Sequence, residues 1–200
     1  MMIATMYAAL LLAAPSQGAD TACIVGRSVM PGRGVINLNP QVRARSPLDS
    51  VTLRVGDGVL KVCYGRPSAR GRTMIGGADV PFGRIWRTGA NEATMLHVTR
   101  PVMIAGIHVE PGSYSLYTVP GEREWEIIVN RSYLQWGHES TYTDSVRAQE
   151  VGRGRVPVAA TPAHVEQFTI RGEAGRNGAA TLILEWERTR VAVPVTPMRR

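Results

Sequence analysis

The sequence predicts an all-β domain: an antiparallel β-sandwich or partly open barrel of about eight to ten short strands, with at most a short helix. Three observations favour this class. Strand-forming Val, Ile, Thr and Tyr dominate the apolar runs. Apolar and polar residues alternate in short segments that turn signals separate. The 21 Gly and 13 Pro among 200 residues suit many turns.

The first two predicted strands form a hairpin. Apolar and polar residues alternate over residues 50–55, which is the period of a half-buried strand. The Gly-Asp-Gly turn at 56–58 leads into a second strand over residues 59–64. In this second strand, Lys61 and Cys63 are expected to face away from the core.

The later strands show the same alternation, with turn residues between them. The strand that precedes Pro157 is expected to end there or at Pro162, and Pro194 suggests a sheet edge. One short helix is predicted near residues 144–149, with Asp144 as its cap. The further predicted strands cover residues 93–100, 102–104, 107–109, 113–119, 125–130, 153–158, 165–171, 180–187 and 190–195.

The N-terminus predicts an exported protein. Residues 1–19 resemble a signal peptide, because their apolar run has the length of a signal core and is too short for a membrane span. Residues 20–45 show little periodicity and are predicted to be a flexible linker. Residues 46–197 then form a single β domain. The predicted location is the periplasm or the extracellular medium, and no membrane span is expected.

Cys23 and Cys63 are the only cysteines. In an oxidising compartment they could form a disulfide, but Cys23 lies in a weakly patterned segment, so the sequence leaves the pairing open. No His or Asn motif accompanies either residue, which argues against a catalytic thiol. The four His are scattered without the spacing of metal ligands, so we expect no metal site.

The formal charge of +7 does not by itself predict a nucleic-acid partner. Almost all of the positive charge is Arg, and these residues are spread along the chain instead of forming a stripe. No zinc-finger, helix-turn-helix or RNA-binding signature is present. No glycine-rich phosphate-binding motif appears either, so we expect neither a nucleic-acid partner nor a nucleotide cofactor.

The segment from residue 64 to residue 94 is the densest in Arg, Gly, Pro and aromatic residues. It connects two predicted strands, and loops of this length in compact domains are usually functional or disordered. Its content of Trp, Phe, Ile and Met is too apolar for disorder. We therefore predict a long, ordered Arg- and Gly-rich loop.

This loop carries most of the candidate ligand-binding residues. Arginine forks suit carboxylate, phosphate or sulfate groups, and a Trp–Arg pair suits a sugar or an aromatic ligand. In the alternative interpretation, Arg87 pairs with Glu92, Trp86 lies in the core, and Gly89 and Asn91 adopt left-handed turn conformations. The candidate ligand-binding residues are Arg66, Arg72, Trp86, Arg87, Asn91, Glu92 and Trp136.

Three function hypotheses follow for this loop. The first is binding of a small polar or anionic ligand, or of a glycan. The second is a hydrolase that uses Glu92 as general acid or base, which requires a second carboxylate among Asp79, Glu110 and Glu139. The third is a structural or interaction domain of the cell envelope. The oligomeric state cannot be inferred from the sequence.

Five motifs carry a resemblance to a known family. In chain order, YGRPSARGR, VPFGRIWRTGANEAT, EPGSYSLYTVPGEREW, IIVNRSYLQWG and VEQFTI resemble the bacterial domain of unknown function 2911. The resemblance covers about residues 46–195 and implies a bacterial, exported, mostly β protein. It implies no activity and no catalytic residues. Cys63, just before the first motif, departs from the common pattern, so no family-wide role is implied for it.

Overall fold

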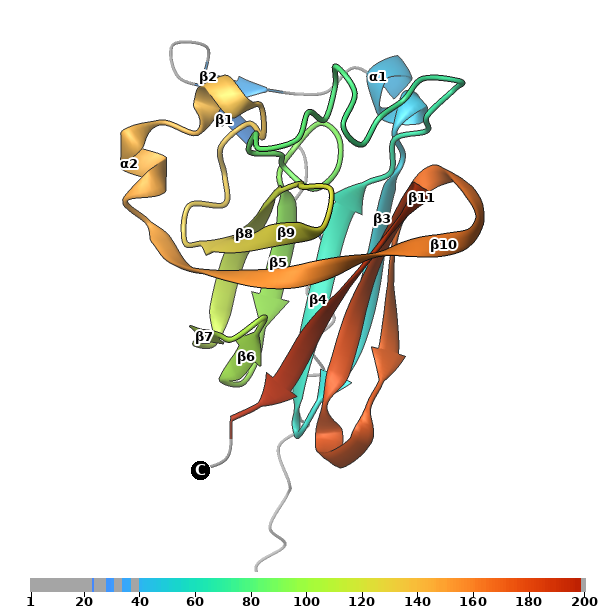
Figure 1. The fold of residues 1–200 in the computed structure, drawn as a ribbon. Helices are drawn as coiled ribbons and strands as arrows, with labels where there is room; N and C mark the ends of the chain where they lie inside the picture. The colour runs from blue at the N-terminus through green and yellow to red at the C-terminus, as the bar shows by residue number, and fades with distance from the viewer. Residues whose placement is uncertain (1–22, 24–27, 31–33, 37–39, 199–200) are drawn as a thin grey trace, which may run out of the picture.

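The structure is a computed structural model that describes residues 23, 28–30, 34–36 and 40–198 (Figure 1). The signal peptide predicted for residues 1–19 lies outside the described residues. Among the described residues, no helix is long and apolar enough to cross a membrane.

Strands make up most of the described chain, and the helices are short. The strands are β1 (Ser28–Met30), β2 (Gly34–Ile36), β3 (Leu48–Val55), β4 (Gly58–Gly65), β5 (Thr94–Val98), β6 (Val102–Ile104), β7 (Ile107–Val109), β8 (Gly112–Val119), β9 (Glu124–Asn130), β10 (Glu150–Ala174) and β11 (Ala180–Pro197). The helices are α1 (Pro40–Arg45) and α2 (Asp144–Arg147), with 3₁₀ turns η1 (Glu139–Thr141) and η2 (Arg176–Gly178).

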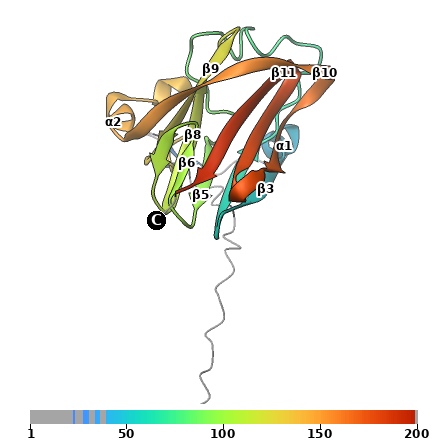
Figure 2. The same cartoon turned by 60° about the horizontal axis from the view of Figure 1, so that its bottom comes forward.

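Nine of the strands form one antiparallel sheet in the order β3-β4-β5-β8-β9-β10-β11-β6-β7, which confirms the predicted all-β class. Strand β10 pairs with β9 along its first part and with β11 along the rest. It arches over the other strands as it does so (Figure 2). Both β10 and β11 also contact β3, so the sheet folds back on itself around the core.

The prediction that β10 would be two strands broken at proline was wrong. Pro157 pairs with Glu124 at the end of the β9 ladder, and the pairing with β11 begins at the next residue, Val158. Pro162 lies in a register shift, where the ladder requires no amide hydrogen from it. The prolines therefore mark the places where the strand changes partner or bulges.

Two further boundaries also differ from the predictions. The segments predicted at 180–187 and 190–195 form the single strand β11, in which Glu187 has a left-handed φ of 53° at the irregular part of the ladder. Helix α2 begins at Asp144, but its cap is Thr143, so Asp144 is the first helical residue and not the cap.

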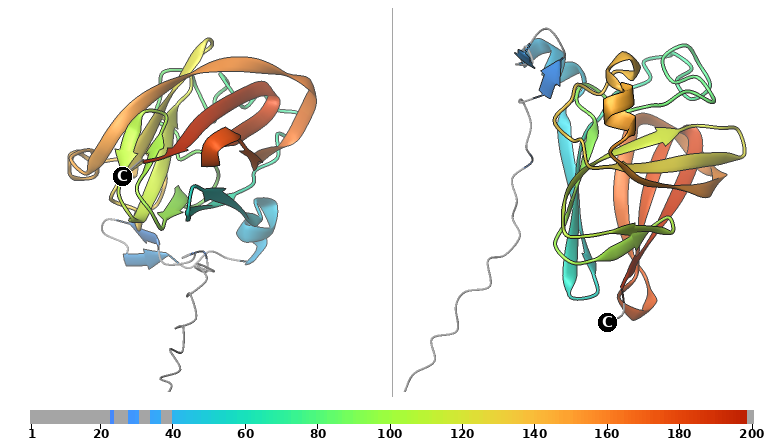
Figure 3. Two further views of the ribbon diagram at one scale, coloured as in Figure 1. Left: turned by 90° about the horizontal axis from the view of Figure 1, so that it is seen from below. Right: turned by 90° about the vertical axis from the view of Figure 1, so that its left-hand side faces the viewer.

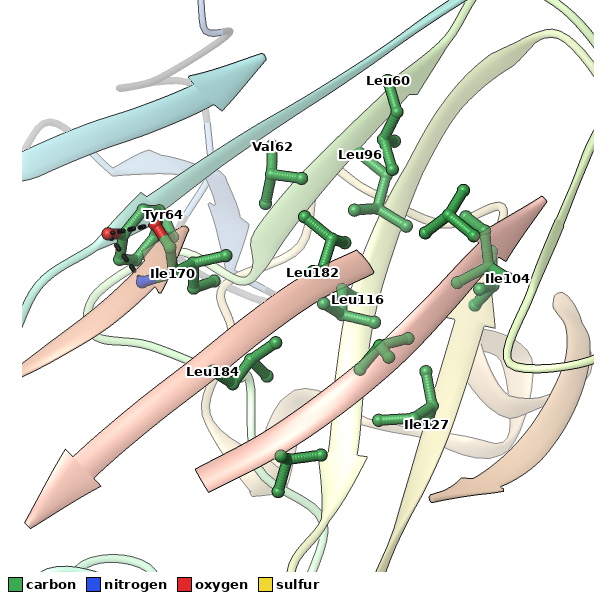
Figure 4. Close-up of a cluster of buried hydrophobic side chains, with 14 of the residues drawn as sticks. Leu60, Val62, Tyr64, Leu96, Ile104, Leu116, Ile127, Ile170, Leu182 and Leu184 are labelled. Carbon is green, nitrogen blue, oxygen red and sulfur yellow. Dashed lines mark hydrogen bonds between the residues drawn. The ribbon is translucent and has the colours of Figure 1, made fainter. Parts of the chain in front are cut away.

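The core lies between the two halves of the folded sheet (Figure 4). Residues that alternate along β4, such as Leu60 and Val62, point inward toward Leu182 and Leu184 of β11. Tyr64 joins the two halves directly. Its hydroxyl accepts a hydrogen bond from the Ile170 amide of β10 at 2.8 Å and lies 3.2 Å from the Ile170 carbonyl. Burial raises the pKa of the Tyr64 phenol to about 12.

The outer face of the β3–β4 half is also covered. Lys61 and Cys63 point away from the core, yet both are almost completely buried. Cys63 forms a disulfide with Cys23, and their Cα atoms are 5.8 Å apart. Strands β1 and β2 and helix α1 lie on this side, opposite β10 and β11 (Figure 3). The described residues of segment 20–45 thus include two short strands, the helix α1 and one end of a disulfide.

We predict that the Cys23–Cys63 disulfide contributes about 3–4 kcal/mol to stability, because it closes a long loop in the unfolded chain. The double variant Cys23→Ser/Cys63→Ser should show this loss of free energy of unfolding in urea titrations. A reductant should lower the midpoint of the wild type but not that of the variant. Equal stabilities of variant and wild type would show that the bond does not stabilise the fold.

Candidate ligand-binding groove

The loop between β4 and β5 is anchored by Trp86, which inserts into the core and is only 8% exposed. Its ring stacks on Trp186 of β11 at 5.9 Å with an interplanar angle of 20°. The edges of Trp125 and Phe168 meet it at 6.0 Å and 5.0 Å. Its indole N–H donates to the Gly89 carbonyl at 3.1 Å, so its polar atom is satisfied although buried.

The backbone of the loop is bonded to the sheet at several points. Trp86 and Thr118 of β8 exchange two amide–carbonyl hydrogen bonds of 2.7 and 2.9 Å. The Glu187 carboxylate accepts from the amides of Met74 and Ile75 at 3.0 and 2.8 Å. Carboxylate–amide bonds of this kind are stronger than neutral ones. The loop is therefore an ordered part of the domain, as its apolar content predicted.

The turn after Trp86 depends on unusual backbone conformations. Thr88 and Asn91 adopt left-handed φ angles of 56° and 67°. The prediction was correct for Asn91 but not for Gly89, which has no positive φ. Gly89 is required for space instead: a Cβ there would lie 3.0 Å from the Gly65 carbonyl oxygen. The close approach of these two backbones holds the turn against β4.

This turn forms one wall of a groove of about 650 Å³. The other walls are the end of α1, the first half of the long loop and residues 137–139, all at the end of the sheet where α1 and α2 lie (Figure 1). Trp86 and Trp186 contribute to its floor. Four of the predicted ligand-binding residues line the groove together, namely Arg72, Trp86, Arg87 and Asn91, while Arg66, Glu92 and Trp136 are not part of the lining.

Two arginines of the groove are paired with acids. Arg72 contacts Asp79 at 2.8 Å, and both side chains are about half exposed. Arg84 makes two bonds of 2.8 Å with the Glu139 carboxylate. The Arg84 guanidinium lowers the pKa of Glu139. Arg84 and Glu139 were not among the predicted ligand-binding residues. Arg84 could have been suggested by its position in the dense arginine segment, and Glu139 was considered only as a second carboxylate for hydrolysis.

Arg87 is the most constrained arginine of the groove. Its stem packs against Gly137, where an added Cβ would lie 2.7 Å from Arg87 Cβ and Cδ. Its guanidinium carbon lies 6.0 Å from the centre of the Trp136 ring. One terminal nitrogen donates to the Asn91 carbonyl at 3.2 Å. Burial lowers the pKa of Arg87, and among the residues that the structure describes it forms no ion pair with a carboxylate.

Arg45, the last residue of α1, also lines the groove. Its carbonyl accepts a bond from the Arg70 guanidinium at 3.0 Å. Within the described part of the chain, its own guanidinium has no hydrogen-bond or ion-pair partner. Sequence reasoning missed Arg45 because it lies in the segment that was predicted to be a flexible linker.

Glu92 and Arg66 serve the framework of the domain. The Glu92 carboxylate binds the Arg43 guanidinium of α1 through both oxygens, one contact being 3.0 Å. The predicted pairing of Glu92 with Arg87 was therefore wrong, and α1 supplies the partner. Arg66 pairs with Asp49 of β3 at 3.1 Å and also donates to groups of β10. Neither side chain lines the groove.

The carboxylates that could assist Glu92 in hydrolysis are also occupied. Asp79 and Glu139 are paired with groove arginines, and Glu110 contacts His108 at 3.1 Å. Glu92 itself does not line the groove. Among the described residues, no group of three or more His, Cys, Asp or Glu side chains could hold a metal ion.

The comparison with family models identifies the chain. The model described as "Protein of unknown function (DUF2911)" matches residues 46–195. The chain belongs to this family. The match begins at the end of α1 and extends into β11, so the DUF2911 region includes the long loop, the arginines after Arg45 and the aromatic cluster. Searches of the curated proteins and of the solved structures found no match.

We predict that Arg43→Ala destabilises this DUF2911 protein by about 2–3 kcal/mol, because it leaves the Glu92 carboxylate, 13% exposed, without its partner. Arg72→Ala is the matched control. It breaks an exposed ion pair and two bonds to the nearby Ala69 and Ser68 carbonyls, and it should cost no more than about 1 kcal/mol. Urea titration of both variants measures the difference. Equal losses would show that Arg43 does not anchor α1.

Proposed function

We propose that this protein is an exported, non-catalytic module that binds a small anionic ligand in the groove. The observation that carries the proposal is the arrangement of Arg45, Arg72, Arg84 and Arg87 around one cavity. Arg45 comes from α1, whereas Arg72, Arg84 and Arg87 come from the long loop, so two separate segments of the chain meet at the groove. Guanidinium forks recognise carboxylate and phosphate oxygens, and a concave site limits the competing water.

The geometry supports an anion more than a neutral glycan. Sugar binding would use an exposed aromatic face, but Trp86 is enclosed by other rings. One face of Trp136 is covered by the Arg87 guanidinium, and Trp136 is not part of the groove lining. The groove therefore offers charge, and little aromatic surface, to a ligand.

Export is part of the proposal. The apolar run near the N-terminus has the composition of a signal peptide. The Cys23–Cys63 disulfide suits an oxidising compartment, where such bonds persist. We propose the periplasm or the extracellular medium as the location.

The two other hypotheses have less support. The hydrolase hypothesis needs a free Glu92, whose carboxylate binds Arg43. An interaction domain would be supported by a large exposed apolar patch. Within the described chain, the exposed large apolar residues are Val42, Phe82, Leu134 and Met198. They come from four separate segments, and nothing indicates what would cover them.

The groove can be tested by calorimetric titration with citrate as an anionic probe and sorbitol as a neutral one. We expect citrate to bind to the wild type. Added salt should weaken this binding, and Arg45→Ala should lower the affinity for citrate about fivefold. Arg45 has no ion-pair partner among the described residues, so its removal should leave the fold intact.

Arg54→Ala is the matched control. Arg54 is an exposed arginine of β3 next to the β3–β4 turn, and it does not line the groove. This variant should bind citrate as the wild type does. Equal effects of the two variants, or binding of sorbitol as tight as that of citrate, would contradict the proposal.

A further inference from the structure

The charges of the groove divide into two classes. Arg72 with Asp79, and Arg84 with Glu139, form two ion pairs that need no further counter-charge. Arg45 and Arg87 form no ion pair among the described residues. The acidic residues of the lining are thus already used, and two positive charges stay uncompensated.

The acidic residues beside the groove do not balance these two charges. Both oxygens of Glu92, the nearest in sequence to Arg87, bind Arg43. Glu166 accepts the Arg70 amide at 2.7 Å and lies 3.4 Å from His164. Each of these carboxylates is held by a partner on the framework. Glu92 therefore acts on Arg87 only from a distance, and neither Arg45 nor Arg87 has a carboxylate within ion-pair distance among the described residues.

Arg87 has the features of an anchor for an oxyanion. Gly137, the Trp136 ring and the Asn91 carbonyl hold its stem and its plane in place, so little side-chain entropy is left to lose on binding. Its remaining N–H donors have no partner among the described residues. They keep contact with solvent, because Trp125 Nε1 is the only buried side-chain nitrogen or oxygen of the described residues that lacks a hydrogen bond. These donors can bind a carboxylate or phosphate through two oxygens.

We propose that the groove selects a dianion, a small ligand whose two negative charges are shared between Arg87 and Arg45. This inference rests on the proposed function and specifies the ligand of the same groove. A monoanion would leave one arginine uncompensated, and a neutral polyol would leave both. Arg87 acts as the preformed, partly buried fork, and Arg45 as the accessible second charge at the end of α1.

Two chemical sources supply two negative charges in a small molecule, and the experiment separates them. A dicarboxylate carries them at its two ends, whereas inorganic phosphate at mildly alkaline pH carries them on one centre. Calorimetric titrations of the disulfide-intact protein would use succinate and inorganic phosphate as the dianions. Monomethyl succinate is the matched monoanion, because it keeps the length of succinate and lacks one charge.

We expect succinate or phosphate to bind at least about tenfold more tightly than monomethyl succinate. In Arg45→Ala, the dianions should bind at most about twofold more tightly than monomethyl succinate, because only their second charge contacts Arg45. In Arg54→Ala, the difference in affinity between the dianions and monomethyl succinate should be as large as in the wild type. Arg87→Lys keeps the positive charge but loses the guanidinium fork. It should lower the affinities for the dianions and for the monoanion by similar factors.

Each result decides a different claim. If monomethyl succinate binds as tightly as the dianions and Arg45→Ala weakens both equally, the dianion inference is overturned and the anion-binding groove stands. If none of these acids, phosphate or citrate binds, both the inference and the proposed function fail. If Arg87→Lys does not fold, Arg45→Ala still decides, because the Arg45 side chain has no hydrogen-bond or ion-pair partner among the described residues.

Discussion

The burial of Trp86 is the interaction on which the rest of the structure depends. Three aromatic rings from β9, β10 and β11 surround its indole, and each such ring pair contributes about 0.5–1.5 kcal/mol beyond the burial of area. These strands belong to both halves of the folded sheet. One residue of the long loop therefore fills the space where the halves meet, and it fixes the loop to the core.

The positions of the groove residues follow from this anchor. Arg87 comes directly after Trp86, its stem packs against Gly137, and its guanidinium donates to the Asn91 carbonyl of the following turn. The loop cannot rearrange freely around a ligand while the indole is enclosed. The groove is thus preformed, which reduces the conformational entropy that binding would cost.

The N-terminal segment completes the site with two arginines that have different roles. On the same short helix, Arg43 is neutralised by Glu92, and Arg45 carries a charge without a described partner. The first residue attaches α1 to the turn that follows Trp86, and the second faces the groove. The disulfide at Cys23 attaches the start of the same segment to β4.

The fold could be predicted from the sequence because the signals of strands are local. The alternation along residues 50–55 and the turn at 56–58 require only near neighbours in the chain, and both predictions were confirmed. The loop was also predicted to be ordered, from its apolar content. In contrast, Pro157 and Pro162 were misinterpreted because the change of strand partner along β10 is a property of the whole sheet.

The candidate site was predicted only in part, for the same reason. Arg72, Trp86, Arg87 and Asn91 do line one groove, but Arg45 was missed because its neighbours in the chain resemble a linker. The contacts that order this segment are long-range, since Arg43 and Glu92 are 49 residues apart in the sequence. No local sequence pattern predicts which carboxylate an arginine will pair with in the folded chain.

Native-state hydrogen exchange of the unmodified protein tests the central claim, that Trp86 fixes the loop to the core. The Trp86 amide donates to the Thr118 carbonyl at 2.7 Å. The account predicts that this amide opens with a free energy within about 1–2 kcal/mol of global unfolding, together with the amides of β8. Exchange of the Trp86 amide at the rate of an unstructured peptide, while β8 stays protected, would contradict it.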